Sequence, residues 1–249
     1  MLYYPVKGRK DKMSKEAFPE WLQAIHITLD DKQKKQFEQY YQLLVEWNER
    51  MNLTGITEEQ EVYEKHFYDS LTGASLPAFK AEGSFIDVGS GAGFPSLPLK
   101  ICFPELQVTI VDSLKKRIGF LEEIVSELGL EGVTLIHDRA EQLARQKAYR
   151  DQFDMASARA VARLPVLLEL CLPFVKPGGV FIAWKGASGE EELHTAENAL
   201  AKLEAEAGSP EKMKLPKENS ERVLLTFAKK KKTPKAYPRK SGTPAKNPL

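Results

Sequence analysis

A glycine-rich loop that follows a short apolar segment offers the clearest ligand-binding chemistry in this sequence. Residues 85–88 read Phe-Ile-Asp-Val and predict a buried strand. Residues 89–93 then alternate glycine with small side chains, before Phe94 and Pro95. Glycine permits a tight turn and lets a ligand lie against bare backbone, and Pro95 suits a first helical turn, where an N–H has no partner. A strand, a glycine loop and a helix start are typical of a nucleotide site; an ordinary glycine-rich turn is the alternative.

The glycine spacing separates two classes of cofactor. The dinucleotide fingerprint is G-x-G-x-x-G, and from Gly89 it would require glycine where the chain has Phe94. The observed G-x-G-x-G resembles the first motif of the S-adenosylmethionine-dependent methyltransferases. Asp87, two residues ahead of it, suits the positive amino group of a methionine moiety and would repel a pyrophosphate. Asp112 ends a second predicted strand, over 107–111, and can accept hydrogen bonds from ribose hydroxyls; capping of the next helix is its alternative role.

Composition restricts the class of protein. The chain has 249 residues, 42% of them hydrophobic, which is enough for one large α/β domain with an extension. No apolar run is long enough to cross a bilayer, and residues 1–15 contain no signal-peptide core. Cys102 and Cys171 lie in apolar segments, which favours free thiols and a cytoplasmic location. The four histidines lack ligand spacing, so no metal is expected.

The net charge of +1 hides a split between the body and the end of the chain. Residues 229–249 carry eight Lys or Arg and no acid, which leaves 28 of the 36 basic residues against 35 acidic ones, or −7, in residues 1–228. A basic segment beside an acidic body predicts contact with nucleic acid; a solvated tail is the alternative. Prolines in this tail predict an extended or mobile segment from residue 233 onward.

The sequence divides into an N-terminal appendage (1–15), a helical cap (16–80), a methyltransferase domain (81–232) and a basic Pro-rich tail (233–249). In the cap, Asp30 is the expected N-cap of a helix with one aromatic face. The next part alternates strands with helices, which predicts a mostly parallel sheet covered on both faces. The expected strands are 85–88, 107–111, 133–137, 153–157 and 179–184, and the expected helices are 95–102, 114–129, 139–147 and 163–174. A helix over 190–207 and a hairpin of 210–215 with 222–228 should follow.

Further motifs follow one another in order over roughly residues 18–245. They are Asn52-Leu53-Thr54, His66-Phe67-Tyr68-Asp69-Ser70, Asp87 through Leu99, Asp112-Ser113, Lys116-Arg117, Arg139-Ala140-Glu141, Ser157-Ala158-Arg159-Ala160, Lys185-Gly186 and Tyr237-Pro238-Arg239. In this combination the chain resembles the bacterial 16S ribosomal RNA guanine-N7 methyltransferases, also called glucose-inhibited division protein B. Ser96 departs from the glycine of many members, and we expect little consequence because serine is small.

The resemblance implies a class I S-adenosylmethionine-dependent methyltransferase: a Rossmann-like, mostly parallel sheet with helices on both faces and an N-terminal helical cap. It implies methyl transfer from S-adenosyl-L-methionine to N7 of one guanine in the 530-loop region of 16S ribosomal RNA, within free RNA or the small ribosomal subunit. Guanine N7 carries a lone pair and no proton. We therefore expect alignment of the reactants to dominate, with no general base and no assigned catalytic residue. A cytoplasmic monomer without membrane or metal is expected.

Two groups of residues carry the implied site. The cofactor group contains Asp87, Gly89, Gly91, Gly93, Phe94, Asp112, Ala140, Glu141 and Arg159. The RNA-binding candidates are Asn52, His66, Lys116, Arg139, Lys185 and Arg239. Several have plain structural alternatives, namely core packing for Phe94, a salt bridge for Arg159, a satisfied helix histidine for His66 and a solvated helix face for Lys116.

Three other functions fit parts of the sequence. A nicotinamide-dependent oxidoreductase fits the strand and glycine loop, although Phe94 in place of glycine weighs against it. A non-enzymatic RNA-binding or ribosome-assembly factor could retain the fold. A methyltransferase acting on a small molecule or a protein fits the glycine motif but gives the basic tail no role. Binding of S-adenosylhomocysteine against NADH separates the oxidoreductase from the methyltransferase.

Overall fold

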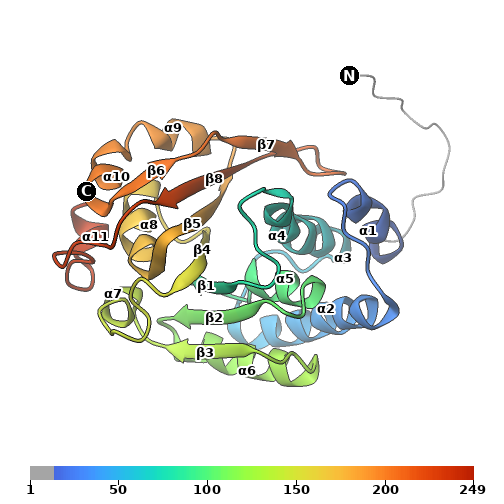
Figure 1. Cartoon of the computed structure of the whole chain (residues 1–249). Coiled ribbons are helices and arrows are strands. Elements are labelled where there is room, and N and C mark those ends of the chain that lie inside the picture. The colour runs from blue at the N-terminus through green and yellow to red at the C-terminus, as the bar shows by residue number, and fades with distance from the viewer. Residues whose placement is uncertain (1–13) are drawn as a thin grey trace, which may run out of the picture.

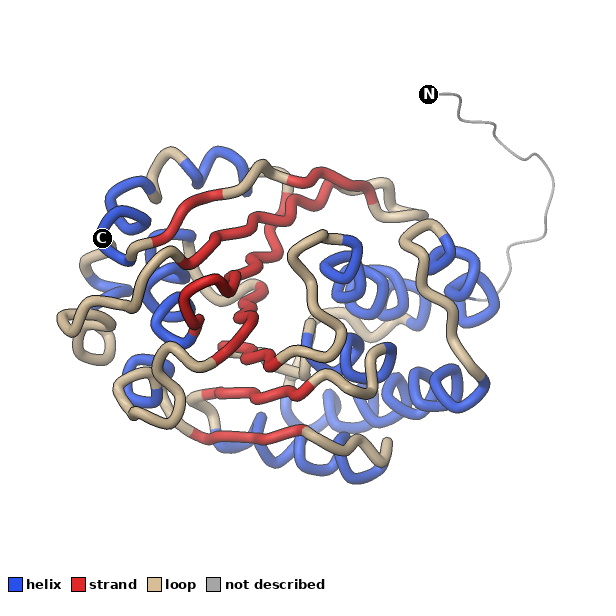
Figure 2. Tube along the Cα trace, viewed as in Figure 1, coloured by secondary structure: helices blue, strands red, loops and turns tan. Residues whose placement is uncertain are grey.

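The computed structural model describes residues 14–249, so all but the last two residues of the predicted appendage lie outside the described residues. These residues form one sheet of eight strands in the order β3-β2-β1-β4-β5-β8-β6, with β7 paired to β8. The sheet is twisted and lies between two groups of helices (Figures 1 and 2). The bounds of the strands are Ser84–Val88 (β1), Gln107–Asp112 (β2), Val133–His137 (β3), Phe153–Arg159 (β4), Val175–Gly186 (β5), Ala205–Ala207 (β6), Glu211–Lys214 (β7) and Glu221–Lys229 (β8).

The pairing of the strands confirms the predicted sheet. Strands β1 to β5 pair in parallel, and Asp87 of β1 stands in register with Ile110 of β2. β8 runs antiparallel to β5, with Gly186 opposite Arg222, and β7 continues as the expected hairpin partner of β8. Because parallel strands end at the same edge, Asp87, Asp112 and Arg159 all arrive at one side of the sheet.

The N-terminal helices confirm the predicted helical cap. Asp30 and Gln33 form a reciprocal capping box at the start of the long helix, with N–H to side-chain oxygen distances of 2.7 and 2.9 Å. The helical segments are α1 (Ser14–Gln23), α2 (Asp31–Met51), α3 (Glu59–Val62), a π-helical turn (Tyr63–Tyr68), α4 (Asp69–Leu71) and a 3₁₀ turn (Thr72–Ser75).

The helices between the strands appear where expected, but several are shorter than predicted. Their bounds are α5 (Ser96–Cys102), α6 (Lys115–Glu127), α7 (Ala140–Leu143) and α8 (Leu164–Cys171), the last followed by a 3₁₀ turn (Leu172–Phe174). The helix predicted over 190–207 is wrong in its extent. It divides into α9 (Gly189–Leu193) and α10 (Glu197–Leu203). The second helix ends early because Glu204 adopts a left-handed conformation with φ of 58° and the chain turns into β6.

Each face of the sheet carries its own apolar core. The cap helices and α5 pack on one face around Phe85, Ile110 and Met155, and α7, α8 and α10 pack on the other around Ile86 and Ala156. Alternate residues of one strand therefore serve opposite cores. The cap shares its core with the sheet and with the segment that follows the glycine loop.

The expectation of an extended or mobile tail is wrong. Residues 233–249 lie against the body, include the short helix α11 (Thr243–Lys246), and bury Thr233, Pro238 and Pro244. The guanidinium of Arg150 donates to the carbonyls of Thr233, Pro234 and Tyr237 at 2.8 to 3.0 Å. The composition of the tail indicated its charge, whereas the side chains that hold it lie elsewhere in the sequence.

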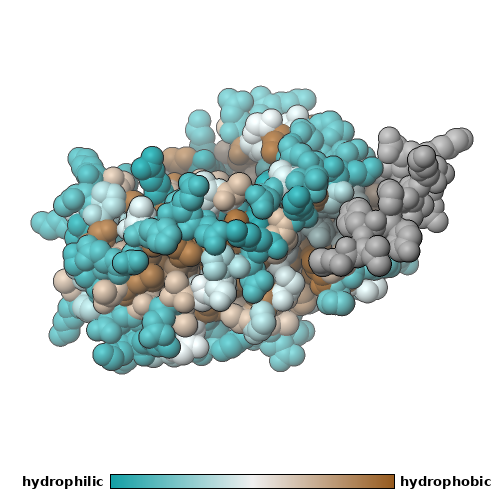
Figure 3. Space-filling model, turned by 90° about the horizontal axis from the view of Figure 1, so that it is seen from above, coloured by the Kyte–Doolittle hydropathy of each residue, from teal (hydrophilic) through white to brown (hydrophobic). Residues whose placement is uncertain are grey.

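The surface of the described chain is mainly polar. Within residues 14–249 no helix is both long enough and apolar enough to cross a bilayer. Seen from above, hydrophilic side chains cover most of the molecule, and the apolar ones form small separate patches between them (Figure 3).

Candidate active site

The glycine loop turns back over the carboxyl end of β1. Gly89 donates its N–H to the carbonyl of Val111 at 2.8 Å, and Gly89, Gly91 and Gly93 have φ values of 72°, 61° and 94°. A Cβ at Gly93 would stand 2.6 Å from the Tyr40 hydroxyl, whereas a Cβ at Gly91 would meet nothing within 4 Å. Gly93 is therefore required by close packing, and Gly91 leaves bare backbone facing open space.

Asp87 lies beneath this loop with no exposed surface. Its Oδ2 accepts the N–H of Ser96 at 3.3 Å, and its Oδ1 accepts the hydroxyl of Ser157 at 2.7 Å. Burial raises its pKa to about 7, which these hydrogen bonds oppose. The carboxyl group joins β1 to the start of α5 and to β4, so it organises the loop from below.

A hollow of about 420 Å³, here called the central hollow, opens beside the loop at the carboxyl ends of the strands. Gly89, Asp112, Arg139, Ala140 and Glu141 all line it. Asp112 also accepts the N–H of Leu114, the residue immediately before α6, at 2.9 Å, and it pairs with Arg117 of α6 at 3.3 Å. Asp112 therefore faces the hollow and holds the turn that leads into α6, without capping that helix.

A second hollow, of about 340 Å³, lies between the π-helical turn and the ends of β4 and β5. Basic side chains dominate its lining, so it is called the basic hollow; they are Lys65, His66, Arg159, Lys185 and Arg222. Each Lys or Arg of this set has an acidic partner, and Asp69 serves both Arg159 (2.7 Å) and Arg222 (3.2 Å). Ala160 borders both the central and the basic hollow, so the two adjoin.

An aromatic stack connects the helical cap to these hollows. The ring of Phe94 lies 4.6 Å from that of His66 and 5.5 Å from that of Tyr40, and only 4% of Phe94 is exposed. The packing role considered for Phe94 is therefore present. Burial and the charge of Arg159 lower the pKa of His66 to about 3, so its ring is neutral at physiological pH and bonds to the Thr54 hydroxyl at 2.8 Å.

A third hollow, of about 420 Å³, here called the outer hollow, lies between the end of α2 and the start of α6. It is lined by Asn52 and Lys116, two RNA-binding candidates, and by Leu114, which is 51% exposed. Ser113 and Arg117 line both this hollow and the central one. The three hollows thus follow one another along the carboxyl edge of the sheet.

Of the RNA-binding candidates, Arg239 lines none of these three hollows. Its guanidinium contacts the buried carboxylate of Glu169 at 2.6 to 3.1 Å, in the body of the protein. The sequence also missed residues that line the hollows, namely Lys65, Trp184 and Arg222 in the basic hollow and Gly242 and Ala245 in the central one. Arg222 was accessible to prediction, because a β5–β8 pairing brings it opposite Gly186.

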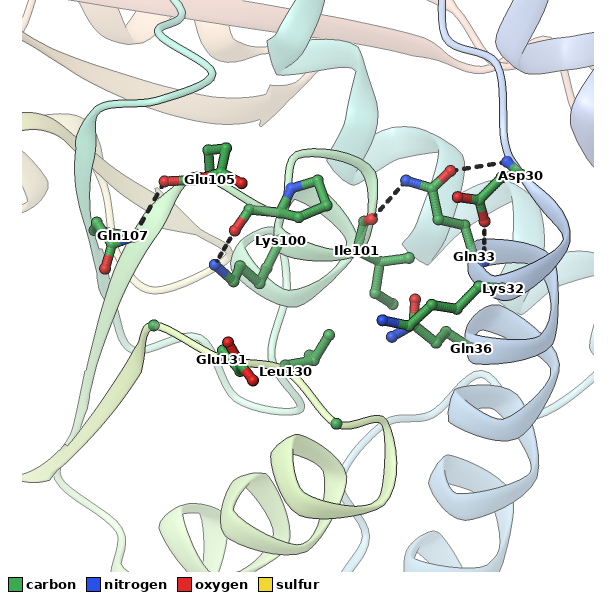
Figure 4. Close-up of a pocket in the computed structure, with 13 residues that line it drawn as sticks. Asp30, Lys32, Gln33, Gln36, Lys100, Ile101, Glu105, Gln107, Leu130 and Glu131 are labelled. Atoms are coloured by element: carbon green, nitrogen blue, oxygen red, sulfur yellow. Dashed lines mark hydrogen bonds between the residues drawn. The ribbon is translucent and has the colours of Figure 1, made fainter.

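Another hollow, of about 500 Å³, lies where α2 begins, beside the turns that precede β2 and β3 (Figure 4). Its polar side chains already hold the fold together. Gln33 donates to the carbonyl of Ile101 at 2.9 Å, and the ammonium of Lys100 donates to the carbonyls of Pro104 and Leu106 at 2.5 and 2.7 Å. These contacts explain why such groups are buried there.

No group of three or more His, Cys, Asp or Glu side chains in residues 14–249 is arranged to hold a metal ion.

The architecture agrees with solved structures of low sequence identity. The YcgJ protein of Bacillus subtilis is similar over 67% of this chain and all of its own, with a TM-score of 0.52 at 13% identity. A 16S rRNA (adenine(1408)-N(1))-methyltransferase from Catenulisporales acidiphilia is similar over 61% of this chain and 87% of its own, with a TM-score of 0.51 at 18% identity.

Sequence relatives extend over nearly the whole chain. A protein of Halalkalibacterium halodurans called Ribosomal RNA small subunit methyltransferase G is 56% identical over 93% of this chain and 98% of its own length. A protein of the same name from Bacillus subtilis is 54% identical over 95% of this chain and 99% of its own length. The model of the GidB family, described as rRNA small subunit methyltransferase G, matches residues 33–222. Because the family model covers most of its length and these relatives are more than half identical to it, this chain belongs to the GidB family, the rRNA small subunit methyltransferases G.

Proposed function

We propose that this protein transfers the methyl group of S-adenosyl-L-methionine to N7 of a guanine in the 530-loop region of 16S ribosomal RNA, as a monomer in the cytoplasm. Membership of the GidB family supports an S-adenosylmethionine-dependent methyltransferase acting on ribosomal RNA. The adjoining central and basic hollows support the finer assignment, because one can hold the cofactor while the other receives a base.

The central hollow fits the cofactor. Asp112 can accept hydrogen bonds from ribose hydroxyls, and Ala140 and Glu141 border the space for the adenine. Gly89 lines the hollow, and Gly91 in the same loop leaves backbone free for the methionine part. Asp87 has no exposed surface, so we assign it the support of the loop. When bound, S-adenosylmethionine supplies a sulfonium methyl group, and the N7 lone pair forms the new C–N bond as the C–S bond breaks.

The basic hollow is the single feature that carries the assignment of the substrate base. Methylation of N7 leaves a positive charge on the guanine, which free cations nearby would oppose. Here Arg159 and Arg222 share the one carboxylate of Asp69, and Lys185 pairs with Glu192 at 2.8 Å, so most of the positive charge is already compensated. The hollow therefore offers hydrogen-bond donors to guanine O6 without a large net positive field.

The remaining candidates surround these hollows. Asn52 and Lys116 are exposed in the outer hollow, and Arg139 is exposed at the rim of the central one. We assign them to the RNA backbone, because exposed basic and amide side chains contact phosphate and sugar oxygens in nucleic-acid complexes. An unstacked loop base, with its N7 edge accessible, is the form of guanine that the basic hollow can receive.

The test is methyl transfer to small ribosomal subunits, and to their extracted RNA, from cells that lack this activity. Tritium from labelled S-adenosylmethionine should enter 16S ribosomal RNA at one position. That position should be cleaved by borohydride and aniline, which break the strand at N7-methylguanosine. Label that resists this cleavage would exclude N7, and label in ribosomal protein would exclude an RNA substrate. Binding to the subunit without any transfer would support the non-enzymatic assembly factor instead.

A further inference from the structure

The C-terminal tail, residues 233–249, contributes part of the wall of the central hollow. Gly242 and Ala245 line this hollow together with Glu141. The N–H of Gly242 donates to Oε1 of Glu141 at 2.8 Å, and Gly242 adopts a left-handed φ of 81° to do so. The tail thus holds a side chain that itself borders the space for the ligand.

A buried ion pair fixes the tail immediately before that contact. The carboxylate of Glu169, on α8, has no exposed surface and accepts the backbone N–H of Arg239 at 2.7 Å. It also accepts Nε and Nη2 of the same residue at 2.9 and 2.6 Å, a two-pronged, charge-assisted arrangement. Nη2 of Arg239 donates in addition to the carbonyl of Asn247 at 2.7 Å, which closes the tail on itself.

Two further arginines hold the stretch that precedes Arg239. Arg150 donates to three tail carbonyls, and Arg145 donates to the carbonyl of Pro238 at 2.5 Å. These two side chains lie between α7 and β4, close to the residues that form the other wall of the hollow. The tail is thereby attached to the same part of the molecule that carries Ala140 and Glu141.

We propose that the tail is a structural wall of the cofactor site, in which Arg239 and Glu169 act as positioning residues for Gly242 and Glu141. The inference rests on the proposed function, because that function places S-adenosylmethionine in the central hollow. It replaces the expectation that the basic tail binds RNA through its positive charge. Lys235 and Lys240 are exposed, but the neighbouring guanidinium is engaged with Glu169 inside the protein.

Calorimetric binding of S-adenosylhomocysteine to the full-length protein tests this proposal without RNA. Arg239→Ala should raise the dissociation constant by about tenfold. The matched control is Lys240→Ala, which removes the same charge from the next, exposed position and should leave the constant within about twofold. The double variant Glu169→Gln/Arg239→Gln avoids an unpaired buried charge and covers the case in which Arg239→Ala does not fold. It should weaken binding by about threefold or more.

The two levels of the proposal fail differently. If the wild-type protein does not bind S-adenosylhomocysteine, both the proposed function and the role of the tail in the cofactor site are contradicted. If the wild type binds and a folded Arg239 variant binds equally well, only the wall is overturned. Equal loss of RNA affinity in Arg239→Ala and Lys240→Ala, with cofactor affinity unchanged, would reinstate RNA binding through the positive charge of the tail.

Hydrogen exchange gives a readout that a purely structural tail would not change. Because coupling between two binding events is reciprocal, saturating S-adenosylhomocysteine should slow exchange of the amides of Gly242, Thr243, Ala245 and Lys246 by about tenfold. Amides of β7, which lies outside the lining of the central hollow, should exchange at the same rate with and without ligand. Unchanged exchange in the tail would overturn the proposal.

Discussion

The guanidinium of Arg159 lies over the ring of Phe94, with Cζ 5.0 Å from the ring centroid. The two partners come from different parts of the fold. Arg159 ends β4 and donates to Asp69 at 2.7 Å and to the carbonyl of Lys65 at 3.1 Å, whereas Phe94 belongs to the segment that follows the glycine loop. Arg159 therefore links the end of β4 both to the cap, through Asp69 and Lys65, and to the segment after the glycine loop, through Phe94. These contacts lie at the boundary between the central and basic hollows.

Arg159→Lys should lower the single-turnover rate of methyl transfer by about tenfold or more. Lysine keeps the charge but loses the planar fork that serves Asp69, Lys65 and the Phe94 ring at once, and small misplacements of reacting groups are costly. Cofactor affinity should change less than the rate. Arg50→Lys, an exposed pair with Glu46, is the control and should leave both unchanged. An unaltered rate in Arg159→Lys would remove Arg159 from the site.

His66 should make the stability of the protein rise with pH. The unfolded chain takes up a proton near pH 6.5, while burial and Arg159 lower the folded pKa to about 3. Between these values the unfolded state binds more protons, so the free energy of unfolding rises with pH up to about 6.5. Measured by urea unfolding, the free energy of unfolding of His66→Gln should rise by about 2 kcal/mol less than that of the wild type between pH 5 and 7.5. An identical gain in both proteins would contradict the neutral, buried ring.

Asp87 should act in the opposite direction. Its folded pKa is raised to about 7 by burial, whereas the unfolded group ionises near pH 4. The folded state therefore holds the extra proton in this window, and stability falls as the pH rises from about 4 to 7. Without cofactor, the free energy of unfolding of Asp87→Asn should fall by about 2 kcal/mol less than that of the wild type between pH 5.5 and 8. The same urea experiments would refute this if both proteins lost equal stability.

The chemical step should need no side chain that accepts a proton. Guanine N7 attacks with a lone pair, and His66 is neutral throughout the physiological range. At saturating substrates the single-turnover rate should therefore show no loss at low pH that belongs to the protonation of a general base. A profile governed by one pKa near neutrality, and abolished by replacing one residue, would favour an exocyclic amine or a hydroxyl as the methyl acceptor.

Lys116→Ala should weaken RNA binding by removing one phosphate contact. The slope of log K against log salt should become shallower by about 0.7, the contribution of one contact on single-stranded RNA. The matched control is Lys32→Ala, which removes an exposed lysine from the hollow beside the turns that precede β2 and β3. Equal slopes for the two variants would exclude Lys116 from the interface, and cofactor affinity should stay the same in both.

The strands were predictable because their signals are local. Short apolar runs bounded by glycine and acidic residues marked β1 and β2, and the capping box of Asp30 marked the long helix of the cap. The end of α10 was less accessible, because the chain turns at Glu204 into β6, whose pairing partner β8 lies further along the sequence. Pairing across distant segments decided that boundary, and local propensity could not.

The site was predictable in its residue types but less so in its contacts. Asp112, Ala140 and Glu141 line one hollow, and Arg159 and Lys185 line the next, as positions at the carboxyl ends of parallel strands suggest. His66 reaches the second hollow from the π-helical turn of the cap. The route of the tail was hidden from the sequence. Its basic composition suggested solvent or RNA, whereas the buried carboxylate that binds Arg239 lies on α8, in an otherwise apolar segment.

The hydroxyl of Tyr40, on α2, donates to the carbonyl of Ala92 in the glycine loop at 2.5 Å, and a side chain at Gly93 would collide with it. At this point the cap and the glycine loop therefore pack directly against each other. In a modular enzyme, a recognition element can be exchanged for another while the catalytic unit is kept. Here a foreign cap would leave the loop without its support, so a change of target must come through substitutions on the outer faces of the existing helices.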